Sequence, residues 1–459
     1  MLGIVVSRAD RASQHIGEHL RTLADWTAED DPTRPDADGG GAVYRTDGAE
    51  LRTFDALHLY LDGVAEAFGD IDVLVFASRH SGETGPLLTA HHTGNFGPAD
   101  HGGDPRDLAR ACPNAHAAVL DALAEHAPDG YEVGTECTHH GPSDVGAPSM
   151  FVEVGSAEPQ WEDPDAARAV AQAILDLRGV DPDRPDHTAA DDGGDGTVDR
   201  YRHLVGFGGG HYAPRFERIV RETDWAVGHV AADWGLDTLG APSAAADLVA
   251  RTFESSRASY AVVEGDRPAL IETVEEQGYR VVGESWVRAV DGVPLPLVER
   301  LEDALVPVAA GLRFGDPART ADPDTPLQTV ALPSELVERT EGIDGERARA
   351  AVADVALAFE TRANGARLGD CAVLVSSGDS DRLIAGLVEI LTSAYDSVER
   401  TDDAVVARKT AFDPAKAAEL GVPEGPKFGK LADGEPVDVN GDTIDPAQVR
   451  SERVERFPL

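Results

Sequence analysis

Cysteine is scarce in this chain of 459 residues, which has only Cys112, Cys137 and Cys371. An odd number of cysteines at such wide spacing excludes a disulfide framework and a Cys-x-x-Cys metal motif. No apolar run approaches the ~20 residues that a membrane-spanning helix needs, so we expect no transmembrane segment. The first residues, MLGIVVSRAD, lead directly into an expected strand, and we therefore expect no signal peptide.

Positive charge is also in short supply, because 40 Lys and Arg face 83 Asp and Glu and give a net charge of −43. The acidic residues are spread among periodic apolar segments, which argues against a disordered acidic tail. We interpret the charge as that of an intracellular protein in a hypersaline cytoplasm, where the Debye length is about 3 Å at 1 M salt. Phosphate attraction is screened at such salt, so the acidity is only weak evidence against a nucleic-acid partner.

Several motifs of common enzymes are missing. The chain has no G-x-S-x-G and no H-E-x-x-H, which argues against α/β-hydrolase and zincin chemistry. The run Gly208-Gly209-Gly210-His211 is not followed by the Lys-Ser/Thr of a P-loop, and His211 stands where G-x-G-x-x-G requires glycine. These glycines predict either a tight turn or close approach of the backbone to a ligand.

The length predicts two or three domains, and the 42% hydrophobic content is enough for sizeable cores. We place the first at residues 1–285 and expect an α/β fold, a mixed sheet flanked by helices. Residues 286–459 are expected to form a smaller α/β domain, because the chain becomes Pro-punctuated and then Ala-rich. Residues 184–199 are an acidic, Gly-rich stretch that predicts a loop within the first domain, with His187 inert.

Alternating apolar runs and turn residues predict the main elements of the first domain. The segment 57–68 fits either a strand with a short helix or a single helix. Asp10 or Ser13 is expected to cap the first helix, although a direct role in a site remains open. Expected strands are Ile4–Ser7, Val73–Ala77, Leu87–Ala90, Phe151–Val154, Leu204–Phe207 and Trp225–Val230, and expected helices are Gln14–Leu23 and Asn114–His126.

Histidine is the informative residue, because all 15 histidines lie before residue 230. Imidazole is the commonest metal ligand in proteins, and zinc is held by His and carboxylate donors. Neighbouring residues on a strand point to opposite faces, so we expect one ligand from each adjacent pair unless the pair lies in a loop. His116 and His126 are expected to be solvated or capping. Seven histidines lie within two residues of Gly, Ser, Thr or Pro at expected strand ends: His80, His91, His92, His139, His140, His211 and His229.

Glu153 lies in the apolar strand Phe151–Val154, where a carboxylate costs free energy unless it is paired or bound to a metal. A site role and a buried salt bridge are both open for Glu153, and Glu136 is a weaker candidate of the same kind. These residues together predict a metal-assisted hydrolase, in which zinc activates water and polarises a carbonyl while a Glu or His moves the proton.

Five separated motifs resemble those of the archaeal and plant type of D-aminoacyl-tRNA deacylase, also called the D-tyrosyl-tRNA(Tyr) deacylase family. The opening Ser7, Asp10 and Ala12-Ser13 also matches, and the resemblance covers about residues 1–285. The motifs are Ser78-Arg79-His80, Thr89-Ala90-His91 with Thr93-Gly94-Asn95, Thr138-His139-His140-Gly141-Pro142, Phe151-Val152-Glu153-Val154-Gly155-Ser156 with Trp161, and Gly209-Gly210-His211-Tyr212-Ala213-Pro214.

The resemblance implies hydrolysis of the ester between a D-amino acid and the terminal ribose of tRNA, which recycles mischarged tRNA. It implies a fold similar to nucleoside phosphorylases and peptidyl-tRNA hydrolase, and two zinc ions per subunit. We also expect a monomer in the cytoplasm. The C-terminal domain looks like an extension found in halophilic relatives, with a stabilising or docking role. The residues expected to act are catalytic Glu153, His80 and His211; metal ligands His80, His91, His139, His140, Glu153 and His211; and substrate-binding Ser7, Asp10, Ser78, Arg79, Asn95, Gly208, Gly209, Gly210 and Tyr212.

Two other interpretations stay open from the sequence. A related peptidyl-tRNA hydrolase or nucleoside phosphorylase would use other chemistry, and a phosphate-dependent turnover would identify the phosphorylase. A module that binds the tRNA 3′ end or a metal without catalysis would bind charged tRNA and leave the ester intact.

Overall fold

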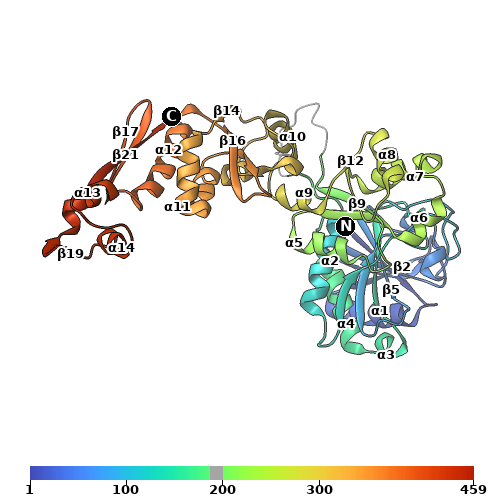
Figure 1. The fold of residues 1–459 in the computed structure, drawn as a ribbon. Helices are drawn as coiled ribbons and strands as arrows, with labels where there is room; N and C mark the ends of the chain where they lie inside the picture. The colour runs from blue at the N-terminus through green and yellow to red at the C-terminus, as the bar shows by residue number, and fades with distance from the viewer. Residues whose placement is uncertain (187–199) are drawn as a thin grey trace. The chain divides into compact units, whose positions relative to one another are not determined.

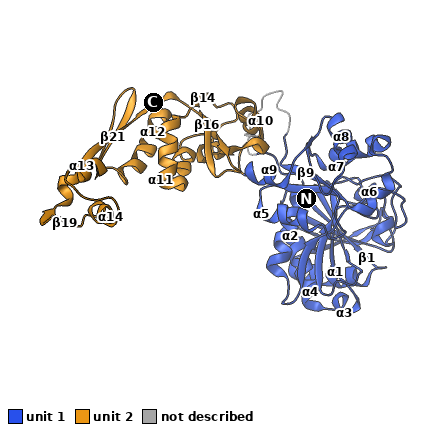
Figure 2. Cartoon of the chain, in the orientation of Figure 1, with its two compact units in different colours: residues 1–291 blue, residues 292–459 orange. Residues whose placement is uncertain are grey.

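The computed structural model describes residues 1–186 and 200–459, and the chain divides into two compact units, residues 1–291 and residues 292–459 (Figures 1 and 2). The boundary lies six residues beyond the predicted one at 285. His187 and most of the expected acidic loop lie outside the described residues. Among the described residues, no helix combines the length and the apolar character that crossing a membrane requires.

An eight-stranded mixed sheet forms the centre of unit 1, in the order β2-β3-β4-β1-β5-β8-β6-β7. The central strands β1, β5 and β8 are almost fully buried, and their near-continuous apolar runs are typical of parallel strands covered on both faces. The strands are β1 (Leu2–Ser7), β2 (Thr27–Asp31), β3 (Gly41–Thr46), β4 (Ala49–Phe54), β5 (Val73–Arg79), β6 (Leu87–His91), β7 (Glu132–Thr135) and β8 (Ser149–Gly155).

The register of three neighbouring strands aligns the residues that matter. β8 runs parallel to β5 and antiparallel to β6, and Glu153 stands opposite Ser78 on one side and Thr89 on the other. Two residues earlier on β8, Phe151 stands opposite His91 of β6. Because residues two apart on a strand share a face, all these side chains lie on one face of the sheet.

Helices cover the opposite face. Asp10 caps α1 (Arg11–Leu23) by accepting hydrogen bonds from the backbone N–H groups of Ala12 and Ser13, so α1 begins three residues earlier than predicted. α1 packs on β1, β5 and α4, and α2 packs on β6 and α4. The remaining helices of unit 1 are α2 (Pro113–His126), α3 (Glu158–Trp161), α4 (Pro164–Asp176), α5 (Pro214–Glu222), α6 (Asp233–Leu239), α7 (Ala246–Ser256), α8 (Pro268–Glu276) and α9 (Glu284–Ala289).

On the face that carries Phe76 and Phe151, loops and two short 3₁₀ helices, η1 (His58–Tyr60) and η2 (Val64–Ala67), take the place of long helices. The segment 57–68 is therefore neither the strand nor the single α-helix that the sequence suggested. Its apolar residues pack against the Phe76–Phe151 core, and this tertiary contact decides its conformation. Because no long helix covers this face, it has room for a site.

A second, parallel sheet in the order β10-β9-β11-β12 completes unit 1. The loop after β7 joins the two sheets: Glu136 N–H donates to Ala90 C=O in the first, whereas Cys137 N–H donates to His211 C=O and Thr138 N–H to Val230 C=O beside the second. The strands are β9 (His203–Phe207), β10 (Ala226–Ala231), β11 (Tyr260–Val263) and β12 (Arg280–Val281).

Unit 2 has its own cores and three small antiparallel sheets, so the predicted α/β class holds for both units. The helices are α10 (Leu295–Ala304), α11 (Ser334–Ala353), α12 (Ser377–Thr392), α13 (Pro414–Glu419) and α14 (Pro426–Ala432). The strands are β13 (Leu312–Phe314), β14 (Gln328–Ala331), β15 (Ala358–Arg362), β16 (Arg367–Leu374), β17 (Ser397–Arg400), β18 (Ala404–Phe412), β19 (Val437–Val439), β20 (Asp442–Ile444) and β21 (Arg450–Pro458).

Candidate metal centre and substrate cavity

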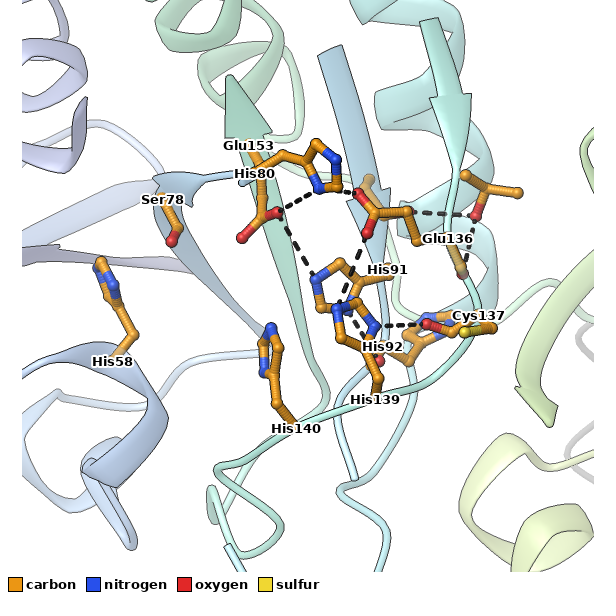
Figure 3. Close-up of polar contacts among 12 residues, drawn as sticks. His58, Ser78, His80, His91, His92, Glu136, Cys137, His139, His140 and Glu153 are labelled. Carbon is orange, nitrogen blue, oxygen red and sulfur yellow. Dashed lines mark hydrogen bonds and ion pairs between the residues drawn. The ribbon is translucent and has the colours of Figure 1, made fainter. Parts of the chain in front are cut away.

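Three imidazoles converge at the carboxyl end of β6. His91 ends that strand, and His139 and His140 come from the loop after β7 (Figure 3). The ring centroids lie 4.3 Å apart for His91 and His139, 4.3 Å for His139 and His140, and 4.9 Å for His91 and His140. One nitrogen from each ring lies within 4.8 Å of the others, so the three could hold one metal ion.

Backbone carbonyls fix the tautomer of these three rings. The Nδ1 atoms of His91, His139 and His140 lie 3.1, 2.8 and 2.8 Å from the carbonyl oxygens of His92, Cys137 and Gly141. A carbonyl can only accept, so each Nδ1 carries the proton and each Nε2 keeps its lone pair. Metal-binding histidines are typically oriented in this way, and His91 Nε2 is buried without a hydrogen-bond partner.

Burial keeps two of the rings neutral. It lowers the pKa of His139 to about 3 and the pKa of His140 well below its usual value. Burial acts in the same direction on His91, but the carboxylates of Glu153 and Glu136, with the His92 carbonyl, together outweigh it and raise the pKa of that ring. Neutral imidazole is the form that binds a metal.

A second group forms around Glu136, which directly follows β7. Its Oε2 lies 2.7 Å from His211 Nε2, and its Oε1 lies 3.1 Å from His80 Nδ1. Burial alone would raise the pKa of Glu136, but the contacts with His211 and His80 outweigh it and hold that pKa well below its ordinary value. His80, Glu136 and His211 each offer one atom within 4.8 Å of the others.

Glu153 lies between the two groups (Figure 3). Its Oε2 is 3.9 Å from His80 Nδ1 and 3.9 Å from His91 Nε2. Burial raises the pKa of Glu153, although His91 opposes the shift. The pKa of Glu136 is therefore lowered, whereas the pKa of Glu153 is raised. Opposite pKa shifts in two neighbouring carboxylates are typical of an acid–base pair whose members have separate roles.

The donor sets fit zinc. Three histidines, or two histidines with a glutamate, are the ligand sets of catalytic zinc sites. The groups His91–His139–His140 and His80–Glu136–His211 share no residue, so two ions could bind at once. Cys137 Sγ lies 3.7 Å from His211 Nδ1, but burial raises the pKa of its thiol to about 12, which disfavours the thiolate.

A cavity of about 360 Å³ opens beside these groups. Phe151 forms part of its apolar lining and stacks on Phe76 with ring centroids 4.6 Å apart. The cavity reaches both the imidazole–carboxylate cluster and a second polar region near α1. Its lining residues are Asp10, Leu57, His58, Leu59, Ser78, Arg79, His80, Ser81, His101, His139, His140, Phe151, Glu153 and His211.

The second polar region consists of Asp10, Ser78 and His58. Asp10 Oδ1 caps α1, while its Oδ2 lies 3.3 Å from Ser78 Oγ and 3.9 Å from His58 Nδ1. All three are buried, and His58 Nδ1 has no hydrogen-bond partner among the described residues. Burial lowers the pKa of His58 to about 3, which keeps its ring neutral, and burial raises the pKa of Asp10.

Arg79 and Tyr212 flank the cluster. The guanidinium of Arg79 lies 4.8 Å from the centre of the Trp161 ring, and Trp161 Nε1 donates to His80 C=O at 2.9 Å. Tyr212 Oη is 3.1 Å from His80 Nε2. Trp161 thus holds both Arg79 and the backbone of His80 in place.

The other predicted substrate residues lie around the cavity without lining it. Ser7 Oγ donates to Ala56 C=O, and Asn95 Nδ2 donates to the carbonyls of Gly102 and Asp104. Gly208 and Gly209 have φ of 104° and 86°, which favours glycine, and they form the turn after β9 that leads through Gly210 to His211.

Two of the seven candidate histidines, His92 and His229, do not join the cluster, and neither does His116. His92 points to the opposite face, as the strand alternation predicted, and its Nδ1 hydrogen-bonds to Gly228 C=O at 3.2 Å. His229 is buried between Ala109 C=O, 2.8 Å from its Nε2, and Thr138 Oγ1, 3.0 Å from its Nδ1. The expectation that His116 is solvated or capping was wrong, because its ring is buried against Ala90 C=O.

Sequence reasoning named His139 and His140 as ligands, underrated Glu136 and missed His58. His139 and His140 both face the cluster because they lie in a loop, where His140 has a φ of 47°. Glu136, thought the weaker carboxylate, contacts both His80 and His211. The signal for Glu136 was its place directly after a strand, whereas nothing in the local sequence marked His58.

Comparisons with known proteins agree with one another. The model of the family described as D-aminoacyl-tRNA deacylase matches residues 67–282. A protein of that name from Halorubrum lacusprofundi is 56% identical over 100% of this chain and 97% of its own length, and one from Haloarcula marismortui is 55% identical over 100% of both. One from Methanococcoides burtonii is 31% identical over 97% of this chain and 94% of its own. A crystal structure of a conserved protein of unknown function has 30% identity and a TM-score of 0.53, covering 63% of this chain and 96% of that one.

Proposed function

The chain belongs to the D-aminoacyl-tRNA deacylase family and hydrolyses the ester of D-aminoacyl-tRNA, and we propose that it does so at the imidazole–carboxylate cluster. The observation that carries this proposal is the convergence of three Nε2 lone pairs, from His91, His139 and His140, beside a cavity that also reaches Glu153. The ester carbonyl would lie at this end of the cavity.

We propose zinc as the cofactor, with two ions per subunit. His91, His139 and His140 would hold one ion, and His80, Glu136 and His211 the other, because these sets share no residue. A bound zinc ion lowers the pKa of water and polarises a carbonyl. Glu136 would also orient the rings of His80 and His211, with which it is in direct contact.

Glu153 would be the general base. Its carboxylate lies at equal distances of 3.9 Å from His80 and His91, and burial raises its pKa toward the range useful for proton transfer. It would accept the proton of the attacking water. The same proton would then pass to the ribose oxygen as the bond between that oxygen and the acyl carbon breaks.

Asp10, Ser78 and His58 would bind the α-ammonium group of the amino acid. That group is a cation two bonds from the ester carbonyl, and the region offers a buried carboxylate and an unpartnered imidazole nitrogen as acceptors. Since Ser78 stands opposite Glu153 across the sheet, the ammonium and carbonyl regions are neighbours. Fixing both groups would leave one direction for the D side chain, which gives the site its chirality.

The remaining predicted residues would serve the nucleotide. Arg79 offers a cation at the cavity wall, and Tyr212 with the turn Gly208–Gly210 would lie against the terminal adenosine. Ser7 and Asn95 would act by holding the adjoining loops, through their hydrogen bonds to backbone carbonyls. We also propose that the protein works as a monomer in a salt-rich cytoplasm, which its net charge of −43 and its haloarchaeal relatives support.

The experiment is cleavage of D-tyrosyl-tRNA and L-tyrosyl-tRNA in molar KCl, before and after exhaustive chelation. We expect the D ester alone to be cleaved, chelation to abolish cleavage, and zinc to restore it. Cleavage that survives chelation would refute the zinc proposal and leave the histidines as direct acid–base groups. Alanine at His80, His139 and His211 should each reduce cleavage, and full activity in all three variants would move the reaction away from this cluster.

A further inference from the structure

Lysine is confined to one part of the chain. All four lysines, Lys409, Lys416, Lys427 and Lys430, lie between residues 409 and 430, and the other 36 of the 40 Lys and Arg are arginines. The segment that contains them, residues 404–459 of unit 2, comprises β18, α13, α14, the β19–β20 hairpin and β21. We name it the lysine segment.

The charge balance of the lysine segment differs from that of the rest of the chain. It holds eight Lys and Arg and ten Asp and Glu, a net charge of −2, whereas the other 403 residues hold 32 and 73, a net charge of −41. Phosphates in direct contact with this segment therefore meet nearly as many cations as carboxylates, which is not so for the rest of the chain.

The strand ladder sets two of these cations side by side. In the β18–β21 pair, Lys409 stands directly opposite Arg453, and both side chains are exposed. Like charges facing each other across a ladder are destabilising. Arg453 donates to Phe412 C=O at 3.4 Å, which leaves most of its guanidinium donors for another group. The Asp396 carboxylate already attracts Lys409, and an anion bound between Lys409 and Arg453 would relieve the remaining repulsion.

Helix α14 adds two further cations to the lysine segment. Lys427 and Lys430 are three residues apart on α14 and so lie on the same side of it. Lys427 Nζ donates to Asp438 C=O at 2.5 Å, which ties α14 to the β19–β20 hairpin, while Lys430 is exposed and makes no ion pair within residues 1–186 and 200–459.

A small hydrophobic core holds α14 against β18. Phe412 of β18 and Phe428 of α14 meet edge to face with centroids 5.3 Å apart, beside the buried Leu431 and Val449. Lys416 Nζ donates to Arg450 C=O at 2.7 Å and ties α13 to the start of β21. The cations therefore stand on fixed elements, which reduces the entropy lost when they bind a ligand.

We propose that the lysine segment binds phosphates of the tRNA body, beyond the 3′-terminal nucleotide. This inference rests on tRNA being the substrate. A cavity of about 360 Å³ can take only the end of so large a molecule, so most of its phosphates need another surface. Ammonium groups bind phosphate without reading base sequence, which suits an enzyme that must accept different tRNAs. In molar salt long-range attraction is screened, so direct contacts of this kind must supply the affinity.

The test compares two double variants of the full chain. Lys409→Gln with Lys430→Gln removes two cations from the segment, and Arg347→Gln with Arg382→Gln removes two exposed cations from α11 and α12 as the matched control. Each protein is assayed for cleavage of D-tyrosyl-tRNA and of D-tyrosyl-CCA trinucleotide, and for binding of uncharged tRNA.

We expect the lysine variant to raise KM for D-tyrosyl-tRNA and Kd for uncharged tRNA by roughly tenfold, with kcat unchanged. The slope of log Kd against log salt should fall by about 1 per lysine. Cleavage of the trinucleotide ester should match wild type. An unchanged Kd for uncharged tRNA, or an equal rise in the arginine control, would overturn the inference. If wild type cleaves neither ester, the proposed function fails, and the Kd measurement still decides the inference separately.

Discussion

His211 Nε2 lies 2.7 Å from Glu136 Oε2, although 75 residues separate them in the chain. Glu136 follows β7 of the large sheet, and His211 follows β9 of the second sheet, so this contact joins the two sheets of unit 1 at the site. The neighbouring backbone bond from Cys137 N–H to His211 C=O, at 2.7 Å, holds the two loops in register. The cluster therefore depends on the packing of one sheet beside the other.

Replacing Glu136 with glutamine should weaken zinc binding by roughly 10- to 100-fold, because the neutral amide no longer attracts or orients His80 and His211. Zinc affinity would be measured by competition with a chelator, with kcat measured at saturating zinc. Glu132→Gln, at the exposed start of β7, is the control. An affinity equal to wild type would show that Glu136 neither binds nor orients a ligand.

Glu153→Gln should lower kcat for D-tyrosyl-tRNA by roughly 10²- to 10⁴-fold with little change in KM, because the amide cannot accept the proton of water. Zinc content should stay at the wild-type level, which separates a proton-transfer role from a ligand role. The exposed Glu158→Gln in α3 serves as the control. If added zinc restores the rate of Glu153→Gln, the residue is a ligand and the general-base assignment is wrong.

Asp10→Asn should raise KM for D-tyrosyl-tRNA roughly tenfold, since the ammonium loses its anionic partner. Asparagine caps helices about as well as aspartate, so α1 should be preserved. Wild type should cleave D-tyrosyl-tRNA faster than its N-acetylated form, and Asp10→Asn should narrow that difference. Asp163→Asn, the N-cap of α4, is the matched control. If wild type and Asp10→Asn showed the same ratio of cleavage rates for D-tyrosyl-tRNA and its N-acetylated form, an ammonium site at Asp10 would be refuted.

Stability should fall as pH drops from about 6.5 to about 4, in part because of His203. Its ring is buried, Nδ1 donates to Ser256 C=O at 2.9 Å, and Nε2 accepts from Arg184 N–H at 2.8 Å. Burial lowers its pKa to about 4, so between that value and ~6.5 the unfolded chain binds the proton and the folded chain does not.

The expected loss from His203 is about 2 kcal/mol of unfolding free energy between pH 7 and pH 5. Urea unfolding in molar KCl at several pH values would measure it. His203→Asn should lower the free energy of unfolding at pH 7 and flatten its pH dependence. An identical pH dependence in wild type and His203→Asn would contradict the prediction.

Strand positions were well predicted where burial dominates the local sequence. The segments Val73–Ala77 and Phe151–Val154 were predicted as strands from their apolar residues. In the structure, β5 contains the first segment and β8 contains the second. His92 lies apart from the cluster, against Gly228 C=O, and alternation along a strand is a local property that the sequence shows. The segment 57–68 was ambiguous, since its conformation follows from contacts with Phe76 and Phe151 that lie far away in sequence.

The amino-acid sequence alone determined the family, the α/β class and the candidate ligands, because motif order, apolar periodicity and side-chain chemistry are local properties of the chain. Only the tertiary structure decided that His139 and His140 face the same point, that Glu136 contacts His80 and His211, and that His58 lies beside Asp10. These relationships depend on loop conformation and on the packing of two sheets, and both are set by contacts between residues distant in sequence.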